Sequence, residues 1–255
     1  MKTKSLSGLF MLCMALILVS CQFKSFEVMK DGVLIRLKSK DNSGASEMKV
    51  QVITDRVIHI TAIPGKSFSK GKSLMAVENK LTLPKFTCKQ EGNELFLRTS
   101  CLNVKIDLNT GAVCYTDTTS KVILAEKQVG VKSFSPVTLE NEKCVSVRQV
   151  FESPDDEAIY GLGENQTSIL NLKGKDADLF QYNTVAVVPF IVSDRNYGIL
   201  WYNNSRTKFG DTREFEELSS MKIYDKSGNT GGLTATYKLK SDTTKAVITR
   251  VEKEY

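Results

Sequence analysis

The sequence predicts an all-β fold, an antiparallel β-sandwich. In short segments, apolar residues recur at every second position, which is the period of a strand with one buried face. Clusters of Gly, Pro, Asn and Asp separate these segments at short intervals, and little of the chain has helical periodicity. The chain has 255 residues, 41% of them hydrophobic, which is enough to bury a sizeable core in one or two domains.

The first clear strands follow residue 33, and turn clusters separate them from the next. Glu91-Gly92-Asn93 and Asn109-Thr110-Gly111 have the pattern of hairpin connections. His59 shares a face of its strand with Val57 and Thr61, and not with Ile58 and Ile60, and is interpreted as a residue on the more polar face. The predicted strands are 33–38, 48–53, 57–63, 95–99, 102–108, 112–116, 145–151, 185–192, 198–202, 221–224, 233–239 and 246–251.

The N-terminus has the features of an export signal. Lys2 and Lys4 precede a short apolar run, and the segment ends Leu18-Val19-Ser20-Cys21. A membrane span needs about 20 apolar residues, so residues 1–20 are better read as a cleaved signal. The ending resembles a bacterial lipoprotein box, which implies lipid attachment at Cys21 and a place in the cell envelope at the outer membrane. An ordinary secretory signal with a chance cysteine is the alternative, and both interpretations export the chain.

Cysteine content and charge exclude several classes of function. In an oxidising compartment Cys88, Cys101, Cys114 and Cys144 allow three disulfide pairings, and for Cys101 a free thiol is as plausible as a bridge. No Cys-x-x-Cys occurs and His59 is the only histidine, so a metal site is not expected. The formal net charge of +6 comes without a dense run of Lys or Arg, so nucleic acid is not an expected partner.

The most distinctive stretch runs from Ile159 to Asn204. Its glycines are followed by amide and carboxylate side chains, which both donate to and accept from sugar hydroxyls, and then by the apolar strand 185–192. An ordinary hairpin is the alternative for Gly161-Leu162-Gly163. The preceding Asp155-Asp156-Glu157 is interpreted as a solvated turn. The polar and glycine residues of the stretch are Gly161, Gly163, Glu164, Asn165, Gln166, Asn171, Gly174, Asp176, Asp178, Gln181 and Asn183.

Several blocks of this stretch resemble the N-terminal domain of glycoside hydrolase family 31. The blocks are Tyr160-Gly161-Leu162-Gly163-Glu164, Leu170-Asn171, Lys173-Gly174, Leu179, Gln181, Asn183, Pro189-Phe190-Ile191-Val192-Ser193 and Tyr197-Gly198-Ile199-Leu200-Trp201. Within the family, Glu164-Asn165-Gln166 and Phe180-Gln181-Tyr182-Asn183 are most similar to bacterial α-xylosidases. The resemblance implies a galactose-mutarotase-like β-sandwich over residues 21–222, carbohydrate as the ligand and no cofactor.

In that family a (β/α)8 barrel follows the sandwich and carries both catalytic aspartates. This sequence has no alternation of strands and helices of the length that a barrel requires, about 200 residues. The resemblance therefore implies the non-catalytic N-terminal part of a retaining α-glycosidase, inactive alone, whose partner is the missing barrel. Its expected substrate-pocket residues are Gly161, Gly163, Glu164, Gln166, Gly174, Asp178, Gln181 and Asn183.

Residues 223–255 are predicted to begin a second β module. Gly232-Leu233-Thr234-Ala235-Thr236-Tyr237 resembles the first strand of a protective-antigen-type β-sandwich insert, here cut short. A competing function is a stand-alone lipoprotein carbohydrate-binding module, which needs an exposed aromatic platform of Trp201, Tyr182, Tyr197 and Tyr202. Trp201 ends a strand-like segment and is expected in the core. A purely structural surface protein needs only the sandwich.

Overall fold

The computed structural model describes residues 25–38, 44–65, 67–69, 71, 73–77, 85–128, 130–164, 166–212, 223–224, 230–231, 233–239 and 241–252. The regular secondary structure of these residues consists of β-strands, and all strand pairs are antiparallel. The predicted all-β fold class is therefore confirmed. In the same residues, no helix is long and apolar enough to cross a membrane. The predicted signal and Cys21 lie outside the described residues.

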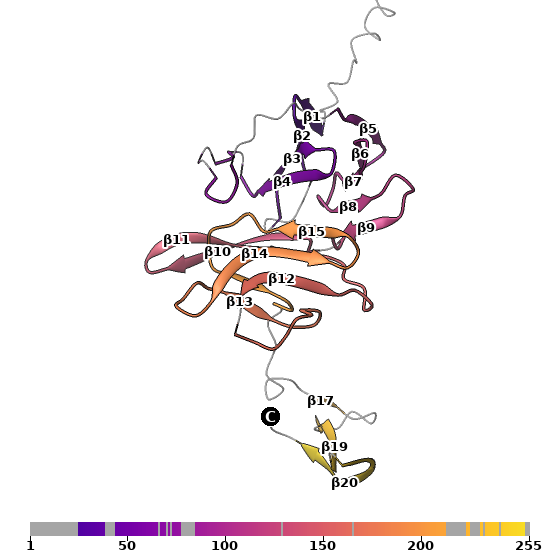
Figure 1. Ribbon diagram of the computed structural model, residues 1–255, viewed down its shortest axis with the longest axis vertical. Helices are drawn as coiled ribbons and strands as arrows, with labels where there is room; N and C mark the ends of the chain where they lie inside the picture. The colour runs from indigo at the N-terminus through magenta and orange to yellow at the C-terminus, as the bar shows by residue number, and fades with distance from the viewer. Residues whose placement is uncertain are drawn as a thin grey trace, which may run out of the picture. The chain divides into compact units, whose positions relative to one another are not determined.

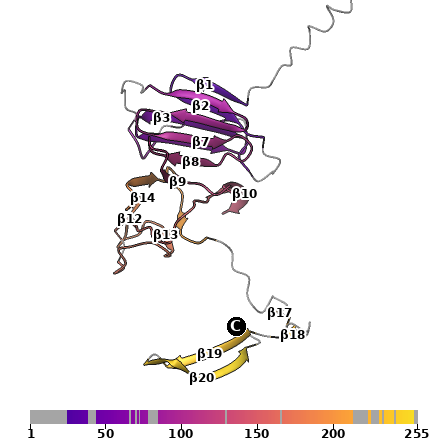
Figure 2. The same ribbon diagram turned by 90° about the vertical axis from the view of Figure 1, so that its right-hand side faces the viewer.

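Two sheets form the main sandwich. The first has the order β1-β2-β3-β4 and the second the order β5-β6-β7-β8-β9 (Figure 1). In Figure 2 the strands β2 and β3 of the first sheet overlap β7 and β8 of the second in the direction of view. The strands are β1 (Phe26–Met29), β2 (Gly32–Arg36), β3 (Glu47–Thr54), β4 (Val57–Ile63), β5 (Thr87–Glu91), β6 (Glu94–Arg98), β7 (Asn103–Asp107), β8 (Val113–Thr116) and β9 (Val122–Ala125).

The hydrophobic core lies between these two sheets, and the alternating pattern of the sequence explains it. Every second residue of β2, β3, β6 and β7 points inward, because successive side chains of a strand point to opposite faces. The fully buried core residues are Val33, Ile35, Met48, Val50, Val52, Leu95, Leu97, Val104, Ile106, Leu108 and Val113. The opposite face of β3 and β4 is polar, with Lys49 paired to Thr61 and Gln51 paired to His59.

A hairpin and a three-stranded sheet complete the same compact unit. The hairpin pairs β10 (Lys132–Leu139) with β11 (Glu142–Gln149), and the sheet has the order β12-β14-β15. Its strands are β12 (Ile159–Glu164), β14 (Ala186–Ser193) and β15 (Tyr197–Leu200). The odd-numbered residues of β14 include the buried Ile191 and Ser193, so the even-numbered ones form its outer face.

A buried ion pair joins the second sheet to the hairpin. The Lys132 ammonium donates to the Glu126 carboxylate and, at 3.0 Å, to the carbonyl oxygen of Gly111. The Val113 amide donates to Glu126 at 2.9 Å, and the Gln149 side-chain amide donates to its other oxygen. Burial raises the pKa of the Glu126 carboxyl and lowers the pKa of the Lys132 ammonium. Nothing in the local sequence predicted this pair.

The chain divides into two compact units. The first contains residues 1–173 and 181–205, and the second contains 174–180 and 206–255. The predicted boundary between residues 222 and 223 therefore does not coincide with this division, and it stays a prediction. In the second unit β13 (Ala177–Leu179) pairs with β16 (Thr207–Phe209), β17 (Ile223–Tyr224) with β18 (Thr230–Gly231), and β19 (Leu233–Leu239) with β20 (Asp242–Glu252).

All four cysteines of the described part of the chain are free. They are Cys88, Cys101, Cys114 and Cys144, and each is half-buried. None of the three possible pairings is therefore formed. Cys101 instead donates its thiol to the Asp55 carboxylate at 3.2 Å, in the free-thiol state that the sequence left open.

Candidate functional site

The glycine motif after residue 159 forms a strained bulge in β12. Gly161, Leu162 and Gly163 have φ angles of 120°, 65° and 90°, and the pairing with β14 shifts register between the two glycines. A Cβ atom on Gly161 would lie 2.3 Å from the Phe190 carbonyl oxygen. Leu162 is 2% exposed, so its apolar side chain anchors the bulge in the interior. The motif is thus more than an ordinary hairpin.

The bulge sets the direction of the polar loop that follows it. Bulges bend a strand and re-aim the side chains beside them. Glu164 ends β12 opposite Ala186 and is exposed, and Gln166 is exposed in the next bend. Asn165 lies outside the described residues. Glu164 and Gln166 are both exposed, and their role at a substrate pocket stays a prediction.

Gln181 closes the other end of the loop by bracing its backbone. Its amide nitrogen donates to the Val185 carbonyl oxygen, and its amide oxygen accepts from the Val187 amide at 2.9 Å. Asn183 is exposed in the tight turn between them. Both polar ends of the Gln181 side chain are therefore used within the loop, at the point where β14 begins.

Replacing Gln181 with alanine should loosen this turn. The change leaves the Val187 amide without its acceptor, and a lost hydrogen bond of this kind costs about 1–2 kcal/mol. We expect the Val187 amide to exchange its hydrogen at least fivefold faster in the Gln181→Ala variant, measured by hydrogen exchange. Asn183→Ala is the matched control and should leave the rate unchanged. Equal exchange in the parent and Gln181→Ala would contradict the bracing role.

Two of the predicted site residues belong to the second unit. Gly174 has φ 65° with open space around it, so it serves a turn and not a close contact. Asp178 lies in β13, and both of its carboxylate oxygens accept from Arg206, one of them at 2.9 Å. The hydrogen bond from Arg206 lowers the pKa of Asp178. The Arg206 guanidinium also lies over the Phe180 ring, 5.6 Å from its centroid.

The eight predicted residues are divided between the two units. Gly161, Gly163, Glu164, Gln166, Gln181 and Asn183 lie in the first unit, while Gly174 and Asp178 lie in the second. Their role at a substrate pocket stays a prediction.

The interpretation of Asp155-Asp156-Glu157 as a solvated turn is wrong for its last residue. Glu157 is 3% exposed and accepts hydrogen bonds from Ser193 and Tyr197, both at 2.5 Å. Burial, and then the hydrogen bond to Glu157, raise the pKa of the Tyr197 hydroxyl. The exposed Asp156 pairs with Arg195 at 2.7 Å. Both partners of Glu157 come from β14 and β15, so its neighbours in the sequence gave no signal of its burial.

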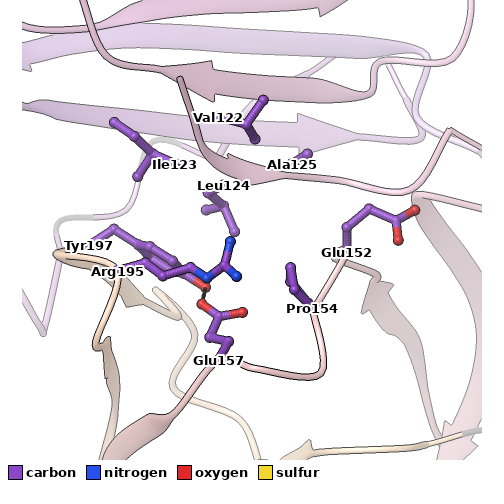
Figure 3. A pocket seen from close by; sticks show the side chains of 9 residues that line it. All are labelled: Val122, Ile123, Leu124, Ala125, Glu152, Pro154, Glu157, Arg195 and Tyr197. Atoms are coloured by element: carbon purple, nitrogen blue, oxygen red, sulfur yellow. Dashed lines mark hydrogen bonds between the residues drawn. The ribbon is translucent and has the colours of Figure 1, made fainter. Parts of the chain in front are cut away.

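A small cavity lies beside Glu157 in the first unit (Figure 3). Its volume is about 50 Å³. Ligand pockets typically measure about 300–1,000 Å³, so a sugar ring does not fit. The lining residues are Val122, Ile123, Leu124, Ala125, Glu152, Pro154, Glu157, Arg195 and Tyr197. The cavity has room for water only and is not a candidate active site.

The outer face of the β12-β14-β15 sheet is apolar and exposed. We call it the outer apolar face, and it consists of Val188, Phe190, Val192 and Leu200, which are 40–48% exposed. Phe190 lies directly opposite Leu200, and Val188 and Val192 flank Phe190 along β14. Glu164 lies at the rim of this face because it pairs with Ala186. Contiguous exposed apolar residues of this kind mark an interaction surface.

His59 lies on the polar side of β4, as predicted, against the ring of Tyr202. The ring centroids are 5.2 Å apart and the planes are tilted by 53°. Burial, and to a smaller extent the charge of Lys49, lower the pKa of the imidazole below its ordinary 6.5. Trp201, expected in the core, is only half-buried, and Tyr202 is 41% exposed.

The His59 environment predicts a pH dependence of stability. The unfolded chain takes up a proton near pH 6.5 and the folded one at lower pH, so the stabilisation is complete above pH 6.5 and is lost as pH falls through the folded pKa. The ring is half-exposed, so we expect a change below about 1 kcal/mol. Urea unfolding at pH 7.5 and 5.5 should show it in the parent and not in His59→Asn. An equal pH dependence in both proteins would contradict the prediction.

Comparison with known proteins agrees with the fold. A family model described as the glycosyl hydrolase 31 N-terminal galactose mutarotase-like domain matches residues 47–209. The fold and this match define a galactose-mutarotase-like sandwich domain of a glycoside hydrolase. The chain belongs to glycoside hydrolase family 31.

Individual relatives point to the same family. The chain is 28% identical over 174 residues to an α-xylosidase of Saccharolobus solfataricus, covering 64% of this chain and 23% of the relative. The crystal structure of an α-xylosidase from Xanthomonas citri superposes with a TM-score of 0.67 at 36% identity, over 88% of this chain and 24% of that one. A dextranase of Flavobacterium johnsoniae, 22% identical over 72% of this chain and 22% of its own, shares the fold with a TM-score of 0.58. The chain spans about a quarter of the length of these relatives.

Proposed function

We propose that the chain is the non-catalytic N-terminal part of an exported retaining α-glycosidase that acts on α-xylosides or α-glucosides. The observation that carries the proposal is the match of residues 47–209 to the family's N-terminal domain, in a chain that spans 24% of a related α-xylosidase. In this role the chain supplies a scaffold and a polar loop, and the catalytic part supplies the reacting carboxylates.

The most buried carboxylates of the described chain support a non-catalytic role. Retaining glycosidases use two carboxyl groups about 5 Å apart on either side of the scissile bond. Glu126 is held by Lys132, and Glu157 is held by two hydroxyl groups beside a cavity of about 50 Å³. Both carboxylates serve the fold, and the cavity beside Glu157 is too small for a glycoside.

The outer apolar face is the surface that we assign to contact with the catalytic part. All four of its side chains are apolar. Covering them stabilises the complex by about 25 cal/mol for each Å² of apolar surface removed from water. Because Glu164 lies at the rim of the same face, docking there also brings the predicted pocket loop toward the partner. The occupant is the rest of the same enzyme, as the chain's share of its relatives' length suggests.

A chimaera tests the proposal. This chain replaces the matching region of the Xanthomonas citri α-xylosidase, and hydrolysis of an aryl α-xyloside is measured. We expect the chimaera to be active, and its Phe190→Asp variant to lose at least tenfold in kcat/KM or in soluble yield. The chain alone should show no turnover. Hydrolysis by the chain alone, abolished by removing one of its carboxylates, would overturn the proposal.

Export and lipidation at Cys21 are part of the same proposal. The Leu18-Val19-Ser20-Cys21 ending supports cleavage before Cys21 and anchoring in the outer membrane. Expressed with its signal in a Gram-negative bacterium, the mature chain should begin at Cys21 and carry a diacylglycerol group, measured by mass spectrometry. Cys21→Ala should abolish the modification. A mature chain that starts elsewhere, or an unmodified thiol, would exclude the lipoprotein interpretation and leave export standing.

A stand-alone carbohydrate-binding module is the second candidate function. The exposure of Tyr182 and Tyr202, at 56% and 41%, favours it, because sugars stack on exposed aromatic rings. The half-buried Trp201 and Tyr197 contribute less to such a platform. An inactive chimaera together with tight oligosaccharide binding by the chain would favour this function over the first.

A further inference from the structure

The outer side of β3 and β4 carries four polar side chains in a two-by-two block. Lys49 lies directly opposite Thr61, and Gln51 lies directly opposite His59. We call Lys49, Gln51, Thr61 and His59 the polar block. All four are half-buried, which is unusual for lysine and glutamine on a sheet surface. The residues between them on the same strands point into the core, so the block has a rigid base.

Two aromatic rings border the polar block. The Lys49 ammonium lies over the Phe68 ring, 4.7 Å from its centroid. At the other side the Tyr202 ring contacts His59, 5.2 Å between centroids, and Tyr202 is 41% exposed. The rings of Phe68 and Tyr202 add apolar surface beside the polar groups of the block. This is the general composition of ligand sites.

Much of the hydrogen-bonding capacity of the block is unused. The Gln51 amide nitrogen donates to Asp31 at 2.6 Å, which leaves the amide oxygen as an acceptor. Within the described part of the chain, the Lys49 ammonium forms no ion pair and neither ring nitrogen of His59 forms a hydrogen bond. The lowered pKa of His59 keeps the ring neutral, with one donor and one acceptor. The block therefore offers donors and acceptors side by side.

We propose that the polar block and Tyr202 form a binding site for a neutral pyranose ring. A sugar hydroxyl both donates and accepts, which matches a neutral imidazole, an amide, a hydroxyl and an ammonium within one small area. The exposed part of Tyr202 stacks on the apolar side of the ring. Among the described residues, Asp31 is the one carboxylate bonded to the block, and Gln51 already engages it, so the site does not favour a metal cation. The choice of a sugar rests on the proposed function.

This site is separate from the loop after β12. It lies on the sheet β1-β2-β3-β4, and none of its residues is among those expected at the substrate pocket. In an enzyme that acts on polysaccharide, such a site would hold a part of the substrate away from the reacting bond. It would raise the local substrate concentration without touching the chemistry.

The single histidine gives a direct test. The His59 ring is the only imidazole in the chain, so its Cε1 proton gives one signal in NMR spectra. We expect this signal to shift in a saturable way when the purified chain is titrated with maltotriose or methyl α-xyloside. Tyr202→Ala should lower the association constant for the sugar at least tenfold. Thr61→Val should lower it at least threefold and leave the fold intact. Tyr237→Ala, at a tyrosine of similar exposure (44%) in the second unit, should leave it unchanged.

Each outcome decides the proposal. No saturable shift with either sugar, or equal binding by the parent, Tyr202→Ala and Thr61→Val, would overturn it. The chimaera assay uses a different surface and a different readout, so an active chimaera with no sugar binding would remove this site and leave the proposed function. Thermal melting of each variant separates lost binding from unfolding.

Discussion

Lys132→Met is expected to lower the free energy of unfolding by about 3–5 kcal/mol. The change removes the cation that faces the Glu126 carboxylate, while Glu126 stays 2% exposed. A buried carboxylate without a cation is costly, and the amides of Val113 and Gln149 compensate only in part. Guanidinium unfolding at pH 7 measures the loss.

Two comparisons identify the cause. Burial raises the pKa of Glu126, and the charge of Lys132 opposes this rise. Removing Lys132 should therefore raise the pKa further. The variant should regain part of the lost free energy of unfolding as pH falls toward 5, because Glu126 then takes up a proton. The double variant Glu126→Met/Lys132→Met should be more stable than Lys132→Met alone, because no charge stays buried. A double variant less stable than Lys132→Met would contradict this cause, because it would show that Glu126 stabilises the fold even without its cation.

Gly163→Ala should prevent stable folding of the first unit or cost at least about 3 kcal/mol. A Cβ atom there would lie 2.0 Å from the Ala186 carbonyl oxygen and 2.7 Å from the Val188 amide nitrogen, both of them backbone atoms that cannot move aside. The residue also has φ 90°, which L-amino acids rarely adopt. The bulge would have to unpair from β14.

Gly92→Ala is the matched control for that substitution. Gly92 also has a positive φ, 61°, but a Cβ atom would meet nothing within 4 Å. Its cost should therefore be only the left-handed backbone penalty of about 1–2 kcal/mol. Circular dichroism and urea unfolding compare the two variants. Similar losses for both would show that the close approach of β12 to β14 relaxes easily and is not a rigid feature of the loop.

The sequence predicted several strands from the alternation of apolar and polar residues. The range 57–63 for β4 and 233–239 for β19 agree with the structure at both ends. β10 was not predicted, because Ser133, Ser135 and Pro136 interrupt its apolar pattern. Its place as one strand of a hairpin beside β11 tolerates a proline, which lacks the amide needed inside a sheet.

Side chains that meet across the fold could not be predicted from local patterns. Glu157 is buried because Ser193 and Tyr197, 36 and 40 residues later, supply the hydroxyl groups that it accepts from. Asp178 is held by Arg206, which lies 28 residues further along. The glycine bulge was visible in the sequence as Gly161-Leu162-Gly163, but the burial of Leu162 between the two glycines was not.

The free state of the described cysteines affects how the folded domain can be obtained. A disulfide typically contributes about 2–4 kcal/mol by restricting the unfolded chain, and the sandwich forms its core without one among Cys88, Cys101, Cys114 and Cys144. The described core is therefore held together by packing and hydrogen bonds and by no disulfide among these four cysteines. We expect a reducing agent in the buffer to leave the melting temperature of this domain unchanged.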